Sequence, residues 1–524
     1  MLYLILSFIP MYLYLFIKSK KAIHILQQNW YNDGNRYLNW ILKNPLKAFN
    51  YDCLFVIFLV GSFLSNNLLM IVFVLFYLVI AYIYNSYLSK EQVKKPLVIT
   101  ARVKRLLITL FLIYIILTIY LVLKLNSLTS IYLILGLSVF LNYLIVLLAN
   151  IINKPIEKLV ALYYKTKAIN KLKNMNNLDV IGITGSYGKT SSKNILSDIL
   201  NIKYNALPTP KNFNTPLGLI ITINNHLDKF NDYLIAEMGA FKRGEIKELC
   251  DLVNPKYGIL TKIGTAHLDS FGSQENIQKG KFELIESLPS DGVGVLNYDD
   301  ELQRNYELKN NCQILKIGIE QKDVDVHASN IKLSPSGTSF DVTFKDDKTK
   351  YKFETKLLGK HNIYNILASL ALGHYFKIEI NKLQAAVKRV RPIEHRLELK
   401  KLGDINIIDD AYNSNPVGSK MALEVLNLMP GKKIIITPGM IELADQEYEL
   451  NKEFGRNIAD TCDEVILVGK DQTKAIQDGL KEKNYKNIHI LNDVKDAFVL
   501  MNKLKDKETY VLIENDLPDI FNEK

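Results

Sequence analysis

The sequence predicts an N-terminal α-helical membrane domain followed by two α/β domains. Five long apolar runs fill the first 155 residues, and from residue 179 onward short β-rich runs alternate with segments of helical periodicity. One of these strands runs into a glycine-containing loop and then a helix, which is an arrangement that binds phosphate. The 524 residues, 48% of them hydrophobic, suffice for two to four domains and exclude a disordered or fibrous protein.

The positive charge of the chain lies in its first third. Residues 1–155 hold 14 Lys and Arg against three acids, which gives +11, the net charge of the whole chain. Residues 156–524 are therefore neutral overall. A nucleic-acid partner is not needed to explain the charge, and we expect no nucleic acid to bind.

The apolar runs predict about five membrane helices. A helix crosses the bilayer core with about 20 apolar residues, and the last two runs meet that length. The first run lacks the basic start and the cleavage site of a signal peptide, so we expect it to be retained as a helix. The runs cover about residues 2–17, 53–65, 67–84, 106–123 and 130–152.

The connecting segments predict the orientation. Segments 18–52 and 85–105 carry six Lys and Arg each, whereas the other two connections carry none and a single lysine. Basic loops remain in the cytoplasm, so five helices would place the chain after residue 152 there. We expect a multi-pass protein of the cytoplasmic membrane, with the lipid bilayer as a partner and the catalytic domains in the cytoplasm. Four scattered cysteines indicate neither a disulfide framework nor a zinc site.

The remainder of the chain predicts mostly parallel sheets covered by helices. A first set of strands is expected at 179–184, 232–237, 257–262, 293–297 and 313–318, and a second set at 405–409, 433–437, 464–468, 487–491 and 509–513. Segment 325–357 reads as a small antiparallel insert. Pro392 interrupts a helical pattern near the expected boundary. The predicted domains are residues 1–155 in the membrane, 156–390 with a P-loop parallel-sheet ATPase fold, and 391–524 with a Rossmann-like fold.

The loop after the first of these strands is the strongest single motif. Gly185 and Gly188 let the backbone approach closely, so that its N–H groups can surround phosphate oxygens at a helix N-terminus. Lys189 would reach the outer phosphates, and Thr190 would offer its hydroxyl to Mg²⁺. The strict pattern requires a glycine where this chain has Ile183, so the loop is a compact variant. The alternative is an ordinary strand–turn–helix junction.

Further polar residues follow this loop along the chain. Glu237 ends a strand, where a carboxylate beside a phosphate loop can hold a hard cation or can simply be a solvated acid. Taken alone, His267 and Lys281 are more often packed or exposed residues than site residues. The later segments contribute Asn297, Asn362, Asn365, Arg396 and Asp410.

In this order the segments resemble the Mur ligase family, ATP-dependent enzymes that add amino acids to the muramyl peptide of peptidoglycan. The resemblance covers about residues 178–470. Segments 408–416 and 438–443 are most similar to the branch of the family that adds D-alanyl-D-alanine.

The resemblance implies a two-site Mg²⁺ centre. Its ligands would be Thr190, Glu237, His267 and a carbamylated Lys281, whose modified side chain ends in a carboxylate-like group. Asp269 is a less certain neighbour of this centre. The catalytic residues that the resemblance implies are Lys189, His267, Lys281 and Arg396.

The resemblance also implies how ATP is bound. Arg396 would reach back from the last domain toward ATP, Asp410 would hold the ribose hydroxyls, and the amides of Asn297, Asn362 and Asn365 suit the adenine side because they offer donors and acceptors. Asn362 is also a candidate helix N-cap. The phosphates would be bound by Gly185, Ser186, Gly188, Lys189, Thr190 and Ser191.

Two departures from the family concern the acceptor. The family's soluble members begin with a domain for the UDP-muramyl end of the substrate, and here apolar helices stand in its place. A Lys-Gly-Ser-Arg type segment near the family's C-terminus is replaced by residues 513–519, which include Glu514. Both changes fall where we expect the acceptor to be recognised.

The sequence therefore favours a membrane ligase that joins D-alanyl-D-alanine, or another amino acid or dipeptide, to a cell-wall precursor that is UDP-linked or lipid-linked. One alternative is a membrane-attached ligase that builds a poly-amino acid such as polyglutamate. The other is a non-catalytic ATP-binding membrane scaffold. Retention of Lys189, His267 and Lys281 together argues against the scaffold, because nucleotide binding alone does not need a carbamylated lysine.

Overall fold

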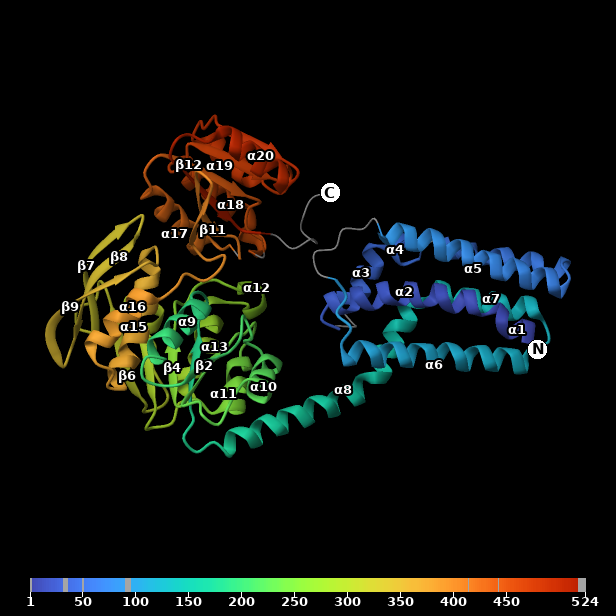
Figure 1. Ribbon diagram of the computed structural model, residues 1–524, viewed down its shortest axis with the longest axis horizontal. Helices are drawn as coiled ribbons and strands as arrows, with labels where there is room; N and C mark the ends of the chain where they lie inside the picture. The colour runs from blue at the N-terminus through green and yellow to red at the C-terminus, as the bar shows by residue number, and fades with distance from the viewer. Residues whose placement is uncertain are drawn as a thin grey trace. The chain divides into compact units, whose positions relative to one another are not determined.

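The computed structural model describes residues 2–31, 36–49, 51–89, 96–412, 414–441 and 443–516. The chain divides into two compact units, Met1–Tyr163 and Tyr164–Lys524 (Figure 1). The first is helical, and the second contains two β-sheets with their helices.

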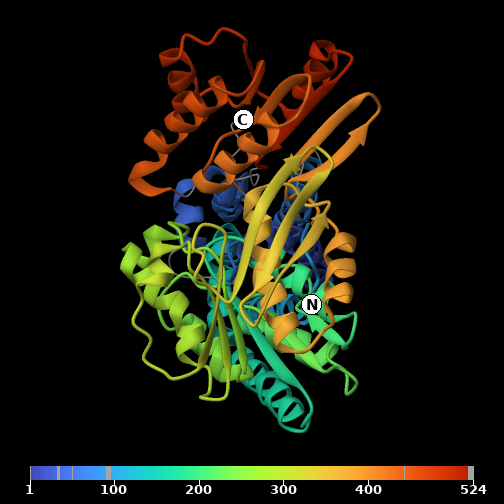
Figure 2. The ribbon, with the colours of Figure 1, turned by 90° about the vertical axis from the view of Figure 1, so that its left-hand side faces the viewer.

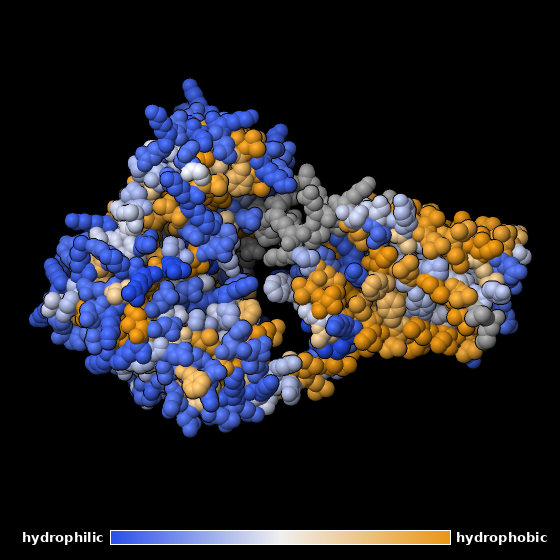
Figure 3. Space-filling model, viewed as in Figure 1, coloured by the Kyte–Doolittle hydropathy of each residue, from blue (hydrophilic) through white to orange (hydrophobic). Residues whose placement is uncertain are grey.

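The first unit consists of helices that follow the apolar runs. Its elements are α1 (Leu2–Ser7), α2 (Ile9–Gln28), α3 (Leu38–Lys43), α4 (Pro45–Ala48), the 3₁₀ helix η2 (Tyr51–Phe63), α5 (Asn66–Ser89), α6 (Ala101–Lys124), α7 (Leu128–Phe140) and α8 (Asn142–Lys173). Apolar residues cover much of the surface of this unit (Figure 3).

The prediction of five membrane helices is confirmed only in part. In the described residues α5 and α6 are long and apolar enough to cross a membrane, and α7 with α8, bent by 74° at their break, would make a third span. The run at 53–65 forms the shorter η2. The run at 2–17 is divided between α1 and α2, and the second half of α2 is polar.

A buried ion pair supports the break between α7 and α8. The Lys18 ammonium pairs with the Asp52 carboxylate, and both side chains are almost inaccessible to solvent. It also donates hydrogen bonds to the carbonyl oxygens of Val139, at 3.0 Å, and Phe140, at 3.2 Å. These carbonyls end α7, where an interrupted helix leaves acceptors without partners. Lys18 therefore caps the broken helix from the inside of the unit.

The first sheet of the second unit has nine strands in the order β2-β3-β1-β4-β5-β6-β7-β8-β9. The strands are β1 (Asp179–Thr184), β2 (Ala206–Pro208), β3 (Tyr233–Glu237), β4 (Tyr257–Leu260), β5 (Val293–Asn297), β6 (Gln313–Gly318), β7 (Val326–Ser334), β8 (Gly337–Phe344) and β9 (Asp347–Thr355). All five predicted strands are present. The expected antiparallel insert is also confirmed, as β7, β8 and β9, the long yellow strands of Figure 2.

Helices cover both faces of this sheet, as the alternation predicted. The helices are α9 (Lys189–Leu200), α10 (Pro216–Asn225), α11 (Glu245–Val253), α12 (Leu268–Phe271), α13 (Gln274–Glu286), α14 (Glu301–Arg304), α15 (Lys360–Tyr375) and α16 (Ile380–Arg389). Ile181 and Ile183 of β1 pack in one core with α9, α15 and α16. Val180 points to the other core, with α10, α11 and α13. The phosphate-loop strand thus lies inside the sheet and is buried on both sides.

The second sheet has six strands in the order β10-β11-β15-β12-β13-β14. The strands are β10 (Glu398–Leu402), β11 (Ile405–Asp410), β12 (Lys432–Thr437), β13 (Glu464–Val468), β14 (Ile488–Leu491) and β15 (Thr509–Glu514), and the helices are α17 (Pro416–Asn427), α18 (Glu447–Ala459), α19 (Lys474–Glu482) and α20 (Val494–Leu504). Five strands are parallel, as predicted, and α17, α18 and α19 share a core separate from that of α20. The antiparallel β10 was not predicted.

The buried pair in the first unit generates a stability prediction. Asp52→Leu leaves the Lys18 ammonium buried without a carboxylate, and we expect a loss of about 3–5 kcal/mol of unfolding free energy. The double variant with Lys18→Met should recover most of that loss. Unfolding in detergent micelles, followed by circular dichroism, measures both. Lys20→Met, which changes an exposed lysine of the same helix, is the control, and wild-type stability of Asp52→Leu alone would contradict the prediction.

Candidate active site

The phosphate loop joins β1 to α9 through two glycines in conformations that other residues rarely adopt. Gly185 has a φ of 148°, and a Cβ built there would lie 2.0 Å from Oγ1 of Thr261. Gly188 has a φ of 82° and forms the N-cap of α9. The loop therefore ends at a helix N-terminus at the carboxyl edge of the sheet, which is where an anion is favoured. The predicted strand–loop–helix arrangement is present.

The lysine of the loop folds back over the loop itself. Lys189 Nζ donates hydrogen bonds to the carbonyl oxygens of Gly185, at 2.8 Å, and Ser186, at 3.2 Å. Burial, opposed by Glu237 and assisted by Arg396, lowers the pKa of Lys189 to about 8. The ammonium is thus held where positive charge is costly unless an anion joins it.

Glu237 ends β3 as the buried carboxylate of the site. Its Oε1 accepts hydrogen bonds from Thr190 Oγ1 and Asn214 Nδ2, both at 3.2 Å. Its Oε2 lies 3.0 Å from Lys193 Nζ and accepts no hydrogen bond among the described groups. The side chain is 2% exposed. A buried carboxylate in contact with the loop hydroxyl, with lone pairs still available, has the donor chemistry that Mg²⁺ prefers.

His267 and Lys281 approach from two other elements. His267, just before α12, has a pKa lowered to about 4 by burial and by the charges of Lys189 and Lys281, so its imidazole is neutral. Its ring packs against Phe241 with the centroids 4.5 Å apart. Lys281 on α13 is 1% exposed and donates to the carbonyl of Ala240 at 3.3 Å. Burial and Lys189 lower its pKa to about 7, so a large fraction of the amine is neutral.

These residues fit a magnesium centre that is completed by its substrate. No group of three or more His, Cys, Asp or Glu side chains suitable for a metal occurs within the described part of the chain. Mg²⁺ is, however, commonly held by one or two carboxylates together with substrate phosphates. Glu237 and the Thr190 hydroxyl, which contact each other, meet that requirement. His267 stays a predicted ligand, and Lys281 would add a carboxylate-like group only when carbamylated.

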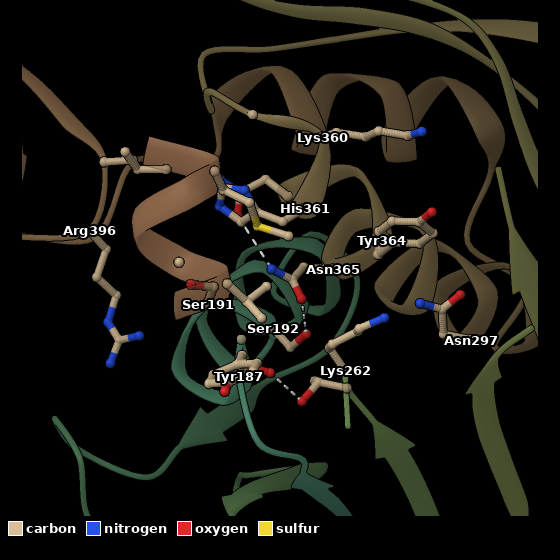
Figure 4. A pocket seen from close by; sticks show the side chains of 18 of the residues that line it. Tyr187, Ser191, Ser192, Lys262, Asn297, Lys360, His361, Tyr364, Asn365 and Arg396 are labelled. Carbon is tan, nitrogen blue, oxygen red and sulfur yellow. Dashed lines mark hydrogen bonds between the residues drawn. The ribbon is translucent and has the colours of Figure 1, made fainter. Parts of the chain in front are cut away.

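A cavity of about 470 Å³ opens beside the phosphate loop (Figure 4). Both α/β domains line it, and so do seven of the residues predicted to bind nucleotide: Gly188, Ser191, Asn297, Asn362, Asn365, Arg396 and Asp410. Gly185, Ser186, Lys189 and Thr190, also predicted to bind nucleotide, are not part of the lining. Glu237, His267 and Lys281 interact with Lys189, and they also do not line the cavity.

The predicted asparagines are hydrogen-bonded within the cavity wall. Asn365 Nδ2 donates to Asn362 Oδ1 at 3.3 Å, and Asn365 Oδ1 accepts from Ser192 at 3.0 Å (Figure 4). Asn362 Nδ2 donates to the carbonyl of Leu358 at 2.9 Å. Asn362 lies in the first turn of α15, whose N-cap is Gly359, so the alternative reading of Asn362 as an N-cap is wrong. These amides order the wall.

The structure adds His361, which the sequence did not predict, to the residues of the cavity wall. Its ring lines the cavity, and its Nδ1 is buried without a hydrogen-bond partner among the described groups. Burial lowers its pKa to about 4, so this nitrogen can accept or donate as a neutral imidazole. Its position beside Asn362 was the only sequence signal. The apolar wall from α17, which includes Met421, Val425 and Leu428, had none.

Arg396 links the two α/β domains. Its Nη2 donates to Thr190 Oγ1 at 3.5 Å, and its guanidinium lies 4.5 Å from the centre of the Tyr412 ring. This contact brings Arg396 to the phosphate loop, and its contact with ATP stays a prediction. Asn413 and Glu442, the side chain of Asp269, and residues 517–519 lie outside the described residues.

Asp410 faces a second carboxyl group across the sheet. It is in register with Glu514 on the parallel neighbour β15, and the fully buried Glu514 accepts a hydrogen bond from Ser414 at 2.6 Å. Burial raises the pKa of Asp410 to about 6, and burial together with Asp410 raises that of Glu514 well above its usual range. The segment that departs from the family, residues 513–519, thus brings a buried acid, Glu514, beside Asp410 of the cavity wall.

Comparison with known proteins agrees with this geometry. The Mur ligase middle domain matches residues 183–373, and the Mur ligase, glutamate ligase domain matches residues 395–514. Over 344 residues the chain is 31% identical to the UDP-N-acetylmuramoyl-tripeptide–D-alanyl-D-alanine ligase of Buchnera aphidicola subsp. Acyrthosiphon pisum, covering 64% of this chain and 73% of that protein. The chain belongs to the Mur ligase family.

Other relatives of this Mur ligase carry the same name as the Buchnera enzyme. The Bacillus subtilis enzyme is 34% identical over 295 residues, or 56% of this chain, and the Escherichia coli enzyme 30% over 300, or 57%. The chain spans 63% and 66% of the length of these two proteins, less than two thirds of each.

Solved structures show the same fold. The MurF ligase of Thermotoga maritima in complex with ADP has a TM-score of 0.60 at 26% identity, over 68% of this chain and 80% of that one. MurF of Acinetobacter baumannii has a TM-score of 0.62 at 25% identity, over 68% and 78%.

The raised pKa of Asp410 generates a pH prediction. An ionised Asp410 can accept hydrogen bonds from both ribose hydroxyls, and hydrogen bonds to a charged group contribute about 1.5–3 kcal/mol each. Above pH 6 Asp410 is mostly ionised, so we expect wild-type protein to bind ADP about ten-fold or more tighter than Asp410→Asn at pH 7.5. Below pH 6 Asp410 gains a proton, and the advantage should shrink toward pH 5.

Calorimetric titration of ADP into both proteins across this range measures the ratio. ADP titrates equally in the two experiments, so the ratio isolates Asp410. A ratio that stays constant from pH 5 to pH 8 would exclude a role for this proton in nucleotide binding.

Proposed function

We propose that this Mur ligase forms carbon–nitrogen bonds with ATP and adds D-alanyl-D-alanine, or another amino acid or dipeptide, to a peptidoglycan precursor. The observation that carries the proposal is the convergence of Lys189, Glu237, His267 and Lys281 at the phosphate loop, beside a cavity that both α/β domains line. The names of the relatives support the same activity.

The chemistry requires activation of a carboxylate, which is a poor electrophile with a poor leaving group. In the proposed reaction an oxygen of the acceptor carboxylate attacks the γ-phosphorus of ATP, and ADP leaves. The amine of the incoming amino acid then attacks the acyl carbon, loses a proton, and expels inorganic phosphate. The contribution of the protein is positioning and positive charge around the phosphoryl group. Lys189 and Arg396 are the cations placed to supply that charge.

Magnesium would bind at the edge of the phosphate loop. Thr190, Glu237 and His267 are the side chains that would hold it, and two sites are expected from the family. When bound, Mg²⁺ neutralises phosphate charge. Lys281 would join them after its neutral amine adds CO₂ and releases a proton, which yields a carbamate. The lowered pKa of Lys281 favours that reaction because the neutral amine is the nucleophile.

Arg396 would also report domain closure. It belongs to the C-terminal domain, whereas its hydrogen-bond partner Thr190 belongs to the central one. A nucleotide between them would be enclosed from both sides, which excludes water from the acyl phosphate. The domain limits in this proposal are residues 1–155, 156–390 and 391–524.

The first unit would place the ligase in the cytoplasmic membrane as a multi-pass protein. The lengths of α5 and α6, and the basic segments on the expected cytoplasmic side, support this location. A membrane location favours a lipid-linked muramyl peptide as the acceptor, whereas the names of the relatives favour a UDP-linked one, and we propose that the acceptor is one of these two. The catalytic unit would lie in the cytoplasm, where ATP is available.

Phosphate release tests the proposal. The purified protein is given ATP, D-alanyl-D-alanine, and either a UDP-linked or a lipid-linked muramyl tripeptide, and the product is identified by mass spectrometry. We expect phosphate release and an amide product with one of the two acceptors. If neither acceptor gives phosphate release, the cell-wall function is refuted. Phosphate release with free glutamate alone would instead indicate a polyglutamate ligase.

Lys281 provides a sharper prediction. Lys281→Ala should lower the rate about 10²–10³-fold, the usual effect of removing one group that stabilises transition-state charge. A short carboxylate such as acetate should restore part of the rate, because it supplies the lost carboxylate-like group. Lys279→Ala, which changes an exposed lysine of the same helix, is the matched control. Full activity of Lys281→Ala would exclude a carbamylated lysine from the reaction.

A further inference from the structure

Most side chains in the middle of α8 are exposed to solvent over almost four turns. From residue 154 to residue 167 every side chain is exposed except those of Glu157 and Val160, which are half-buried. Helix stability in proteins comes mostly from packing of one face, and an isolated stretch of this length is marginal in water. The two faces of this stretch differ in a way that indicates what covers it.

One face of the stretch is apolar. Ile152, Ile156, Leu159 and Tyr163 follow one another at spacings of four, three and four residues, which places them on one line of the helix. They are 48%, 47%, 67% and 64% exposed. Leu148 and Leu144, at 48% and 38%, continue the line toward the start of the helix. At 1.5 Å per residue this apolar stripe is about 28 Å long.

The far side of the same stretch is basic. Lys154, Lys158 and Lys165 repeat at spacings of four and seven residues, so they share a line on the side away from the apolar stripe. The single acid, Glu157, is held by Arg105 of α6 at 2.8 and 2.9 Å. Glu157 therefore pairs with Arg105 and not with Lys158 or Lys165, the two lysines on which the inference rests. The stretch therefore has an apolar line and a basic line, and its half-buried residues, Glu157 and Val160, lie between them.

An anionic membrane surface matches both lines. A helix with a basic face and an apolar face lies at the boundary between lipid headgroups and acyl chains, and each lysine near an anionic surface strengthens the binding. The apolar stripe is also continuous with Leu144 and Leu148, in the half of α8 that packs within the apolar first unit. A protein partner would have to match the same two lines without that continuity.

We propose that residues 152–165 of α8 lie in the interfacial layer of an anionic membrane. The apolar stripe enters the acyl boundary, and Lys158 and Lys165 face the lipid phosphates. The inference rests on the membrane location proposed above but not on the ligase reaction. It gives the last part of the first unit a role of its own, which is to hold the start of the catalytic unit at the membrane surface.

Site-directed spin labelling tests this in the full-length protein. Single cysteines are placed at Ile156, Leu159 and Tyr163, and at Lys158, Ala161 and Lys165, in a background in which the exposed Cys53 is changed to Ser; the other three cysteines are buried. The protein is reconstituted in vesicles of phosphatidylcholine with phosphatidylglycerol. Collision of the labels with oxygen, which concentrates in lipid, and with a water-soluble nickel chelate is then measured.

We expect collision with oxygen to be several-fold higher, relative to the nickel chelate, at the three stripe positions than at the three others. The contrast should shrink in vesicles of phosphatidylcholine alone and at high salt, because both weaken the attraction of the lysines. Equal access of the nickel chelate to both sets would overturn the proposal. Low access of both reagents to the stripe would also overturn it, because protein would then cover the helix.

Two controls separate this inference from the proposed function. Resistance to carbonate extraction reports membrane insertion of the first unit, and ADP binding reports folding of the catalytic unit. A protein that does not insert refutes the membrane location itself. Leu159→Glu with Tyr163→Glu should abolish the oxygen contrast at Ile156 while ADP binding remains at the wild-type level.

Discussion

The site depends on an excess of buried positive charge. Lys193 and Lys281 are buried and Lys189 is half-buried. Glu237 attracts Lys189 and Lys193, and Glu245 and Glu283 attract Lys281. Arg396 reaches the phosphate loop from the C-terminal domain. The same cause, burial, lowers the pKa of all three lysines. Such a cluster is costly unless anions complete it. In the proposed function, the phosphates of a nucleotide and a carbamate on Lys281 would supply these anions.

The opposite charge pattern appears on the C-terminal domain. Asp410 and Glu514 are buried neighbours on parallel strands, and burial raises the pKa of each. A nucleoside triphosphate would place its phosphates beside the lysines of the phosphate loop and its ribose hydroxyls beside Asp410, which lines the cavity. The lysines belong to the central domain and the two acids to the C-terminal one, so such a nucleotide would contact both domains.

The helical unit also contains a buried lysine, Lys18, whose charge and hydrogen-bond donors are matched by partners. A break between α7 and α8 frees carbonyl groups inside an apolar environment, where water is not available to satisfy them. Lys18 satisfies two of them, and Asp52 balances its charge. Beyond the break, α8 extends away from the packed helices, and its apolar stripe is exposed to solvent. The core of this unit is mostly apolar apart from such buried polar groups, and its apolar exterior contrasts with the more polar exterior of the catalytic unit (Figure 3).

The sequence by itself determined the elements whose signals are local. The glycines, lysine and threonine of the phosphate loop, the strands of the two parallel sheets, and the apolar runs follow from spacing and composition, because backbone conformation and hydrophobic periodicity depend on near neighbours. Short or edge strands such as β2 and β10 were missed because pairing with other strands, not local pattern, stabilises them. Only the tertiary structure decided that the apolar runs form two or three helices of spanning length among the described residues, since Pro10 and the polar half of α2 interrupt one run. It alone placed His361 and the α17 wall in the cavity and Glu514 beside Asp410, because contacts between residues far apart in the chain arise only when the sheets assemble.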